Sequence, residues 1–274
     1  MFREAAAIIR DAEVFVITAG AGIGVDSGLP DFRGDQGFWN AYPAYACLGI
    51  SFAECANPQH FASAPRFGWG FYGHRTNLYR DTVPHQGFHI IRSWIERNGA
   101  EYFVVTSNVD GQFQKAGYAE ERISEVHGSI HWLQCQTACN GRIWPNKEVF
   151  EIEAASMRAT SPLPHCPECG KVSRPNILMF GDWNWLAERT STQEERFERF
   201  LANNVNRRIV VIEMGAGSAI PTIRATSERI GWSLEQARVL RINPRESEIQ
   251  PPHLALPYGA LDGLQKIQEA LETK

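Results

Sequence analysis

The sequence predicts an α/β protein built on a Rossmann-like, doubly wound parallel sheet that two inserted segments interrupt. The first observation is a set of short apolar runs rich in β-branched residues, typical of buried parallel strands, at residues 12–20, 101–108, 207–217 and 237–244. The second is a helical pattern at residues 84–99, where Gly99 suits a C-terminal cap and a three-four spacing relates Phe88, Ile91, Trp94 and Ile95. This alternation of strand and helix favours a doubly wound sheet.

Two segments break the alternation and predict the domain organisation. Residues 35–83 are rich in aromatics and glycine, and residues 128–178 contain two cysteine pairs and several prolines. We therefore assign residues 1–34, 84–127 and 179–274 to the Rossmann-like domain. Residues 35–83 are expected to form a helical insertion, and residues 128–178 a smaller module.

Composition limits the classes of function. Hydrophobic residues make up 43% of the 274 residues and charged residues 21%, which are ordinary globular values. A formal net charge of -4 gives no global attraction to DNA or to an anionic membrane. Charged residues interrupt the N-terminal segment, and no run approaches the roughly 20 apolar residues of a membrane span. We expect a cytoplasmic protein that binds neither nucleic acid nor membrane.

A glycine-rich loop follows the first predicted strand. "GAGIG" at residues 20–24 could cradle a phosphate on backbone N–H groups, although such glycines also serve simply to permit a tight turn. The hydride-transfer fingerprint would require glycine at position 25, where Val25 stands. The loop instead continues into Pro30, Asp31, Phe32 and Arg33, residue types suited to covering a bound dinucleotide.

The whole stretch "GAGIGVDSGLPDFRG" resembles the opening motif of the sirtuins, the NAD-dependent protein lysine deacylases. The usual form in that family is G-A-G-x-S followed by S-G-I-P-D-F-R. The resemblance implies NAD as a cosubstrate, with cofactor contacts from Gly20, Ala21, Gly22, Asp31, Phe32 and Arg33.

Further stretches resemble the family in the same order. "TSNVDGQFQKAG" at residues 106–117 is similar to T-Q-N-I-D followed by A-G, which implies that Asn108 and Asp110 bind nicotinamide and that Ser107 contacts the cofactor. In isolation, Asn-x-Asp is also an ordinary turn. "EVHG" implies that His127 is the general base on a ribose hydroxyl, although nearby His131 draws the same suspicion.

The last cofactor motifs lie near the C-terminal strands. "EMGAGSAIP" resembles the family's G-T-S and proline, and "RINP" offers an asparagine where the family contacts ribose. These stretches imply contacts from Gly215, Ser218 and Asn243. The matching stretches run from residue 18 to about residue 243, so the resemblance covers most of the chain.

Two cysteine pairs predict a metal site. "CQTAC" and "CPEC" supply four thiols that could close a tetrahedral zinc site, namely Cys135, Cys139, Cys166 and Cys169. His165 is an alternative ligand, and buried thiols without metal are the other interpretation. The set resembles the structural Zn²⁺ of sirtuins, and protein ligands in all four positions leave none open for catalysis.

A possible acyl pocket lies in the first insertion. Tyr72 and Arg75 would share one face if their segment is helical, and a phenol with a guanidinium can bind a carboxylate. The pair resembles that of sirtuins that prefer succinyl, malonyl or glutaryl lysine. The alternative is a solvated or ion-paired arginine beside an aromatic patch. "RPNILMFGD" resembles the strand beside which the peptide adds, which implies substrate contacts at Phe180 and Gly181.

Departures from the family pattern leave alternatives open. Gly24 replaces the family's serine and Ser107 its glutamine. The leading hypothesis is an NAD-dependent protein lysine deacylase that acts on acylated protein lysine and releases nicotinamide and an O-acyl-ADP-ribose. In the mechanism that the resemblance implies, His127 helps the ribose 2'-hydroxyl attack an imidate. Protein ADP-ribosyl transfer or NAD hydrolysis is the first alternative, and a non-catalytic NAD or ADP-ribose sensor is the second.

Overall fold

A computed structural model describes residues 1–31, 34–47 and 49–273, and within these residues the largest sheet has six parallel strands in the order β11-β10-β9-β1-β2-β3. Their bounds are β1 (Val14–Ala19), β2 (Glu101–Thr106), β3 (Ile123–Glu125), β9 (Ile209–Met214), β10 (Ala237–Ile242) and β11 (Leu254–Leu256). The four predicted strands correspond to β1, β2, β9 and β10. The predicted doubly wound parallel sheet is therefore confirmed.

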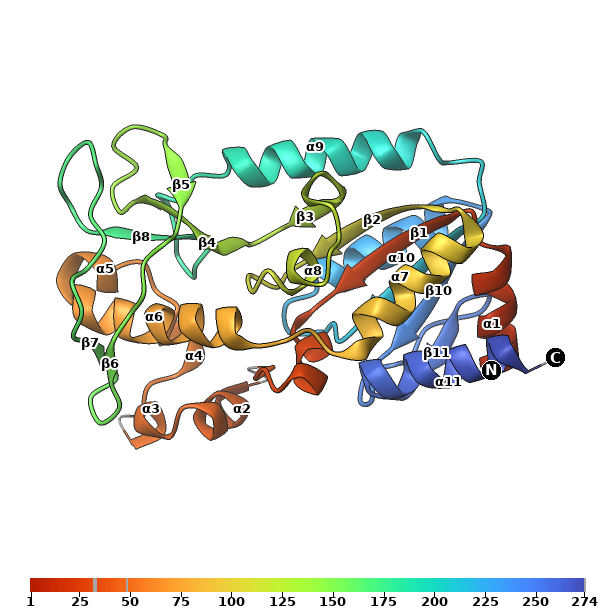
Figure 1. Cartoon of the computed structure of the whole chain (residues 1–274), viewed down its shortest axis with the longest axis horizontal. Helices are drawn as coiled ribbons and strands as arrows, with labels where there is room; N and C mark the ends of the chain where they lie inside the picture. The colour runs from red at the N-terminus through yellow and green to blue at the C-terminus, as the bar shows by residue number, and fades with distance from the viewer. Residues whose placement is uncertain (32–33, 48, 274) are drawn as a thin grey trace.

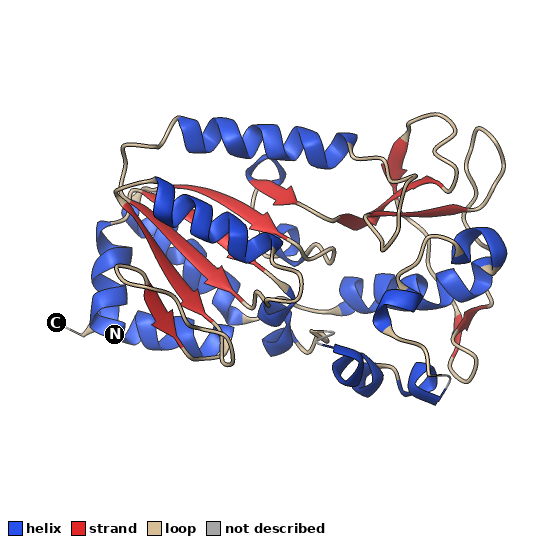
Figure 2. Ribbon diagram, turned by 180° about the vertical axis from the view of Figure 1, so that it is seen from behind, coloured by secondary structure: helices blue, strands red, loops and turns tan. Residues whose placement is uncertain are grey.

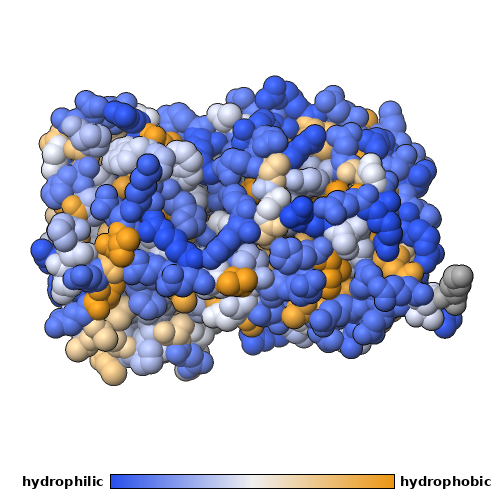
Figure 3. All heavy atoms as spheres, viewed as in Figure 1, coloured by the Kyte–Doolittle hydropathy of each residue, from blue (hydrophilic) through white to orange (hydrophobic). Residues whose placement is uncertain are grey.

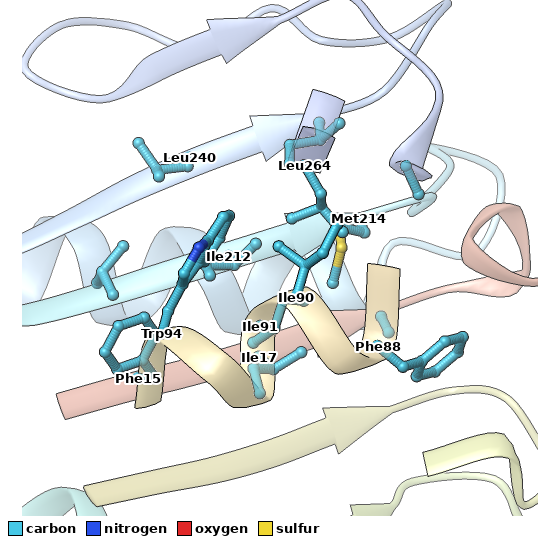
Figure 4. Packing of buried hydrophobic residues seen from close by; sticks show 14 of the residues in the cluster. Phe15, Ile17, Phe88, Ile90, Ile91, Trp94, Ile212, Met214, Leu240 and Leu264 are labelled. Atoms are coloured by element: carbon cyan, nitrogen blue, oxygen red, sulfur yellow. The ribbon is translucent and has the colours of Figure 1, made fainter. Parts of the chain in front are cut away.

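Helices cover both faces of this sheet (Figures 1 and 2). One face packs against α1 (Phe2–Asp11), α7 (Gln86–Asn98) and α11 (Ala260–Glu272), and the other against α9 (Glu188–Ala202) and α10 (Thr222–Ser233). Successive strand residues point to opposite faces, so β1 sends Phe15 and Ile17 into the first core and Val14 and Val16 into the second. Figure 4 shows how α7 packs on the first of these faces.

Helix α7 forms as its sequence pattern predicts. Phe88, Ile91, Trp94 and Ile95 are all buried on its sheet-facing side. Gly99 ends the helix in the left-handed conformation, and its N–H bonds the carbonyl groups of the last turn.

The two predicted insertions pack together at the opposite end of the molecule from the chain termini (Figure 1). The first contains α2 (Gly34–Ala41), α3 (Pro43–Cys47), α4 (Phe52–Cys55), α5 (His60–Ser63) and α6 (Pro65–Asp81). The second contains the antiparallel sheet β5-β4-β8 and the hairpin β6-β7. Their bounds are β4 (Gly128–Cys135), β5 (Ile143–Pro145), β6 (Ile152–Glu153), β7 (Arg158–Ala159) and β8 (Ser173–Ile177).

One hydrophobic cluster joins these two insertions. It combines Trp69 and Phe71 of α6 with Leu133 of β4 and Phe150 of the loop between β5 and β6, and Trp69 stacks on Phe150 at 4.5 Å between ring centroids. Close packing depends on Gly70, because a Cβ there would lie 1.8 Å from the Met157 carbonyl oxygen. The insertions thus share one core instead of forming two.

The carboxyl ends of β1, β2 and β9 lie side by side, because Ala19 pairs with both Thr106 and Met214. The loops that follow therefore meet at one edge, where ligands bind in open α/β sheets. In the described part of the chain, no helix combines the length and apolar character that a membrane crossing requires. The face in Figure 3 is mostly hydrophilic, with weakly apolar residues gathered at its lower left over α2 and α3.

Candidate functional site

A cavity of about 420 Å³ opens where the sheet edge meets the two insertions. The first glycine loop, the loops after β2 and β9, helix α6 and the segment after β8 all contribute to its wall. Residues predicted from sequence that line it are Gly20, Ala21, Asp31, Tyr72, Arg75, Ser107, Asn108, Asp110, His127, Phe180 and Gly215. The structure thus brings together residues from six separate stretches of the chain.

Close packing of two loops explains the glycines at the cavity wall. The Gly22 N–H donates to the Gly215 carbonyl at 3.1 Å, and a Cβ on Gly22 would lie 2.6 Å from the Gly215 Cα. Gly215 has φ +62°, a region that favours glycine. Glycine is therefore required here by loop packing as well as suited to phosphate binding. Gly22 lies behind the wall, whereas Gly20 and Ala21 line it.

The loop after β2 carries an amide and a carboxyl group. The Asn108 side-chain amide donates to the Gly20 carbonyl at 3.2 Å, which ties this loop to the glycine loop. Asp110 Oδ1 accepts from the Gln112 N–H at 2.9 Å. Burial raises the pKa of Asp110 to about 6, and the Glu125 carboxylate acts in the same direction, whereas the Gln112 hydrogen bond and Arg75 lower it. A perturbed carboxyl in a cleft is typical of functional sites.

The two candidate histidines have different environments. His127, at the turn between β3 and β4, lines the cavity, and burial lowers its pKa while a hydrogen bond to the Ser107 backbone acts against that. His131 lies outside the cavity wall, and its Nε2 is 2.9 Å from the Asp110 carbonyl oxygen, to which the ring N–H donates. The structure therefore places His127 at the cavity wall, whereas His131 supports the Asp110 loop.

Tyr72 and Arg75 lie on one face of α6, as their spacing predicts for a helix. The segment is helical from Pro65 to Asp81, and both side chains are buried at the cavity wall. The Arg75 guanidinium carbon is 5.1 Å from the Phe71 ring centroid and 5.5 Å from that of Tyr72. Aromatic faces thus stabilise a buried cation next to the cavity.

The segment after β8 supplies a further part of the cavity wall. Phe180 is 45% exposed and its N–H donates to the Ala56 carbonyl at 3.1 Å, while Gly181 lies outside the cavity wall. A fully buried ion pair between Arg174 and Asp182 fixes this turn, and the Asp182 carboxylate also accepts from the Met179 N–H.

Two predicted cofactor residues lie outside the cavity wall. Ser218 is exposed, and its N–H donates to the Glu246 carboxylate at 2.8 Å. Asn243 is buried and its side-chain amide donates to the Ala216 carbonyl at 2.8 Å. Asn243 therefore orders the loop after β9, whose Ala216 and Gly217 do line the cavity. Phe32 and Arg33 lie outside the described residues.

Comparison with known proteins agrees with this arrangement. The Sir2 family model matches residues 20–202, which is more than half of the chain. The chain belongs to the Sir2 family. An NAD-dependent protein deacylase 1 of Archaeoglobus fulgidus is 29% identical, over 89% of this chain and 86% of that protein. An NAD-dependent protein deacylase of Aquifex aeolicus is 28% identical, over 94% and 95%.

Solved Sir2 structures share the fold. Two mutant Sir2 homologue complexes with ADP-ribose superpose with TM-scores of 0.72 and 0.70 at 25% identity, each covering 98% of both chains. The sequence-based identification of the sirtuin family and of a Rossmann-like fold is thus confirmed.

The four predicted zinc ligands of this Sir2-family chain lie together. Their sulfur atoms are all within 4.8 Å of one another, with Cys135 and Cys169 3.6 Å apart and Cys139 and Cys166 3.7 Å apart. Zinc bonds to sulfur of about 2.3 Å in a tetrahedron place sulfur atoms about 3.8 Å apart, so the donor set fits Zn²⁺. His165 is outside the group, with Nδ1 2.8 Å from the Gly170 carbonyl oxygen.

Sequence reasoning missed several cavity residues of this Sir2-family protein. Tyr79 lines the wall one helical turn beyond Arg75, and its i, i+4 spacing from Arg75 was a usable signal. Phe52 and Ala56 line it from α4 and its C-terminal end. No local pattern marks these two, since only tertiary packing brings them to the cavity.

Proposed function

We propose that this chain is an NAD-dependent protein deacylase that removes acyl groups from protein lysine and releases nicotinamide and an O-acyl-ADP-ribose. The observation that carries the proposal is the cavity wall, where His127, Asn108 and Asp110 lie with the glycine loop. Membership of the Sir2 family and the names of the deacylase relatives support it.

The residues at the wall suit distinct roles. Because burial lowers its pKa, His127 is neutral near pH 7 and can accept a proton from a ribose hydroxyl. The Asn108 amide and the Asp110 carboxyl would hold the nicotinamide carboxamide. NAD, when bound, supplies a ribose carbon that becomes electrophilic as nicotinamide leaves. The cofactor contacts proposed beyond these are Gly20, Ala21, Gly22, Asp31, Phe32, Arg33, Ser107, Gly215, Ser218 and Asn243.

The acyl chain is proposed to be an acidic one, such as succinyl or malonyl, with acetyl as the alternative. Support comes from the buried guanidinium of Arg75 beside Tyr72 at the cavity wall. A guanidinium binds a carboxylate with charge-assisted hydrogen bonds. Phe180 and Gly181 are proposed contacts of the peptide main chain around the acyl-lysine, because an extended peptide adds to a strand edge.

The domain organisation and the zinc site are proposed to serve this reaction indirectly. Residues 1–34, 84–127 and 179–274 form the Rossmann-like domain in this proposal, with residues 35–83 as the acyl-pocket insertion and residues 128–178 as the zinc module. Zn²⁺ bound by the four thiolates would be structural, because protein would fill every ligand position.

Transfer of ADP-ribose to protein, or NAD hydrolysis, is a second candidate. It is favoured by Ser107, which lines the cavity where the family motif has a longer glutamine. A missing hydrogen bond there costs on the order of 1 kcal/mol. Retention of His127 at the cavity wall favours deacylation.

A single assay separates these reactions. Purified protein is incubated with NAD and acetyl- or succinyl-lysine peptides of one sequence, and deacylated peptide, nicotinamide and ADP-ribosylated protein are followed by mass spectrometry. Deacylation should match nicotinamide release and fall by at least about a hundredfold in His127→Ala, the usual scale for losing a general base. NAD consumption that leaves every peptide acylated would instead support transfer or hydrolysis. Ligand binding with no turnover would support a sensor.

A further inference from the structure

Helix α6 presents three polar side chains at the cavity in sequence register. Tyr72, Arg75 and Tyr79 follow one another at spacings of three and four residues, so they share one helical face. All three line the cavity and are at most 6% exposed. Tyr79 is the one of the three to which neither the family resemblance nor the proposed function assigns a role.

The Tyr79 side chain contacts the Arg75 guanidinium through its hydroxyl group and its ring. The Arg75 Nε donates to the Tyr79 hydroxyl oxygen at 2.9 Å, and the guanidinium carbon is 5.3 Å from the Tyr79 ring centroid. Burial raises the pKa of Tyr79, so the phenol stays neutral. The same side chain thus fixes both the edge and the face of the guanidinium.

The use of Nε limits how a carboxylate can approach. A guanidinium binds a carboxylate with two parallel hydrogen bonds, either through Nε and one Nη or through both Nη groups. Because Nε donates to the Tyr79 oxygen, the approach through Nε and one Nη is closed to a carboxylate as long as the Tyr79 contact is kept. A rigid orientation of this kind gives geometric selection for a planar carboxylate over a neutral acyl end.

The main chain of Tyr79 is anchored to the nicotinamide side of the cavity. Since α6 ends at Asp81, the Tyr79 carbonyl is among those with no partner inside the helix, and it accepts from the Gln112 side-chain amide at 3.1 Å. Gln112 is 2% exposed, and its own N–H donates to Asp110 Oδ1 at 2.9 Å. Hydrogen bonds therefore connect Asp110, Gln112, Tyr79 and Arg75 in one series.

We propose that Tyr79 is a positioning residue that holds Nε of Arg75, orients its guanidinium for the carboxylate of an acidic acyl chain, and so sets the preference for acidic over neutral acyl-lysine. The inference rests on the proposed deacylase function and its acidic acyl substrate. It assigns the selectivity to the oriented pair of Arg75 and Tyr79, where Arg75 alone would supply only the charge.

The test is steady-state kinetics of Tyr79→Phe with succinyl- and acetyl-lysine peptides of identical sequence. Loss of one hydroxyl should lower the ratio of kcat/KM for succinyl over acetyl about tenfold, mainly through the KM of the succinyl peptide. The matched control is Tyr118→Phe, which also removes a buried hydroxyl, one that donates to the Phe88 carbonyl at 2.8 Å in the Rossmann-like core. That control should leave the ratio unchanged.

Arg75→Met separates failure of this inference from failure of the proposed function. Suppose that the wild-type protein prefers succinyl, that Arg75→Met abolishes this preference and that Tyr79→Phe retains it. Tyr79 then has no positioning role, although acyl recognition by Arg75 stands. If wild-type protein shows no succinyl preference, or Arg75→Met keeps one, acidic acyl recognition is wrong and the Tyr79 role falls with it. An equal loss for both peptides in Tyr79→Phe would show a merely structural residue.

Discussion

Asp110 has a buried carboxyl group, and the folded structure disfavours its ionised form. Its side chain is 8% exposed, and burial together with the Glu125 carboxylate raises its pKa to about 6 against the opposing effects of the Gln112 N–H hydrogen bond and of Arg75. An unfolded aspartate has a pKa of about 3.9, so the folded chain binds more protons between these two values. The favourable contribution of this group is therefore complete below about pH 4 and is lost as the pH rises through about 6.

Replacing Asp110 with asparagine should stabilise the fold at neutral pH while it impairs the reaction. The asparagine oxygen still accepts from the Gln112 N–H, but no charge has to be buried. The gain should be at most about 3 kcal/mol near pH 8 and vanish near pH 4. Thermal unfolding of both proteins across this pH range measures it. A Tm difference independent of pH would show that Asp110 ionises normally in the fold.

Individual residues also show where sequence reasoning stops. His127 and His131 lie four positions apart, and only the order of the family motifs favours His127 as the base. The structure separates them by long-range contacts, because His131 bonds the Asp110 backbone whereas His127 lines the cavity. Asn243 was predicted from a motif, but its amide bonds the Ala216 carbonyl, a contact that no local pattern encodes.

Helix α9 is bound by an ion pair and hydrogen bonds to the end of β3, from which the chain continues to His127. The Arg189 guanidinium is 2.5 Å from the Glu125 carboxylate, whose side chain is 1% exposed. Thr190 donates to the Glu125 carbonyl at 3.2 Å, and the Glu125 N–H donates to the Gln193 side-chain oxygen at 3.0 Å. The first turns of this helix therefore fix the position of a strand end two residues before His127.

Removing one partner of the Arg189–Glu125 ion pair should destabilise the fold strongly, whereas removing both charges should destabilise it much less. Arg189→Met leaves the Glu125 carboxylate buried without its partner, with an expected loss of about 3 kcal/mol in the free energy of unfolding. Adding Glu125→Gln to this variant should recover most of the lost stability, because the buried amide carries no charge. Denaturant unfolding of the two single variants and the double variant tests it. Strictly additive losses would mean that the pair does not couple.

At the level of elements, local pattern explains what could be predicted. The strands β1, β2, β9 and β10 could be predicted because each is a short buried run rich in β-branched residues, and α7 because its apolar residues follow the helical period. Helix α6 lacks such a local pattern, and its helical form enters the sequence analysis only as a condition for Tyr72 and Arg75 sharing a face. Its glycines and aromatics are packing contacts with the second insertion, as Gly70 against the Met157 backbone shows. That role exists only once residues 65–81 and 150–160 have met.

In the whole molecule, the cavity depends on a fixed position of the smaller end, which the two insertions form, relative to the parallel sheet. Arg75, Tyr79 and Phe180 line the same cavity as Asn108 and Gly215, so a shift of the insertions relative to the sheet would separate the proposed acyl and cofactor contacts. The four-cysteine cluster joins the end of β4 and the loop after it, through Cys135 and Cys139, to the turn before β8, which contains Cys166 and Cys169. A metal there cross-links segments with little regular structure between them.

Removal of Zn²⁺ should therefore loosen the smaller end first and leave the Rossmann-like sheet folded. Elemental analysis is expected to find one zinc per chain, lost in Cys166→Ser and retained in Cys47→Ser, whose thiol is exposed and lies outside the cluster. After chelation, amide exchange should rise across residues 128–178 and in α6, which shares their core, while β1 and β9 stay protected. Deacylation should fall with the loss of protection, because α6 carries the proposed acyl contacts. Protein without zinc, or exchange that rises evenly along the chain, would contradict a structural metal confined to this module.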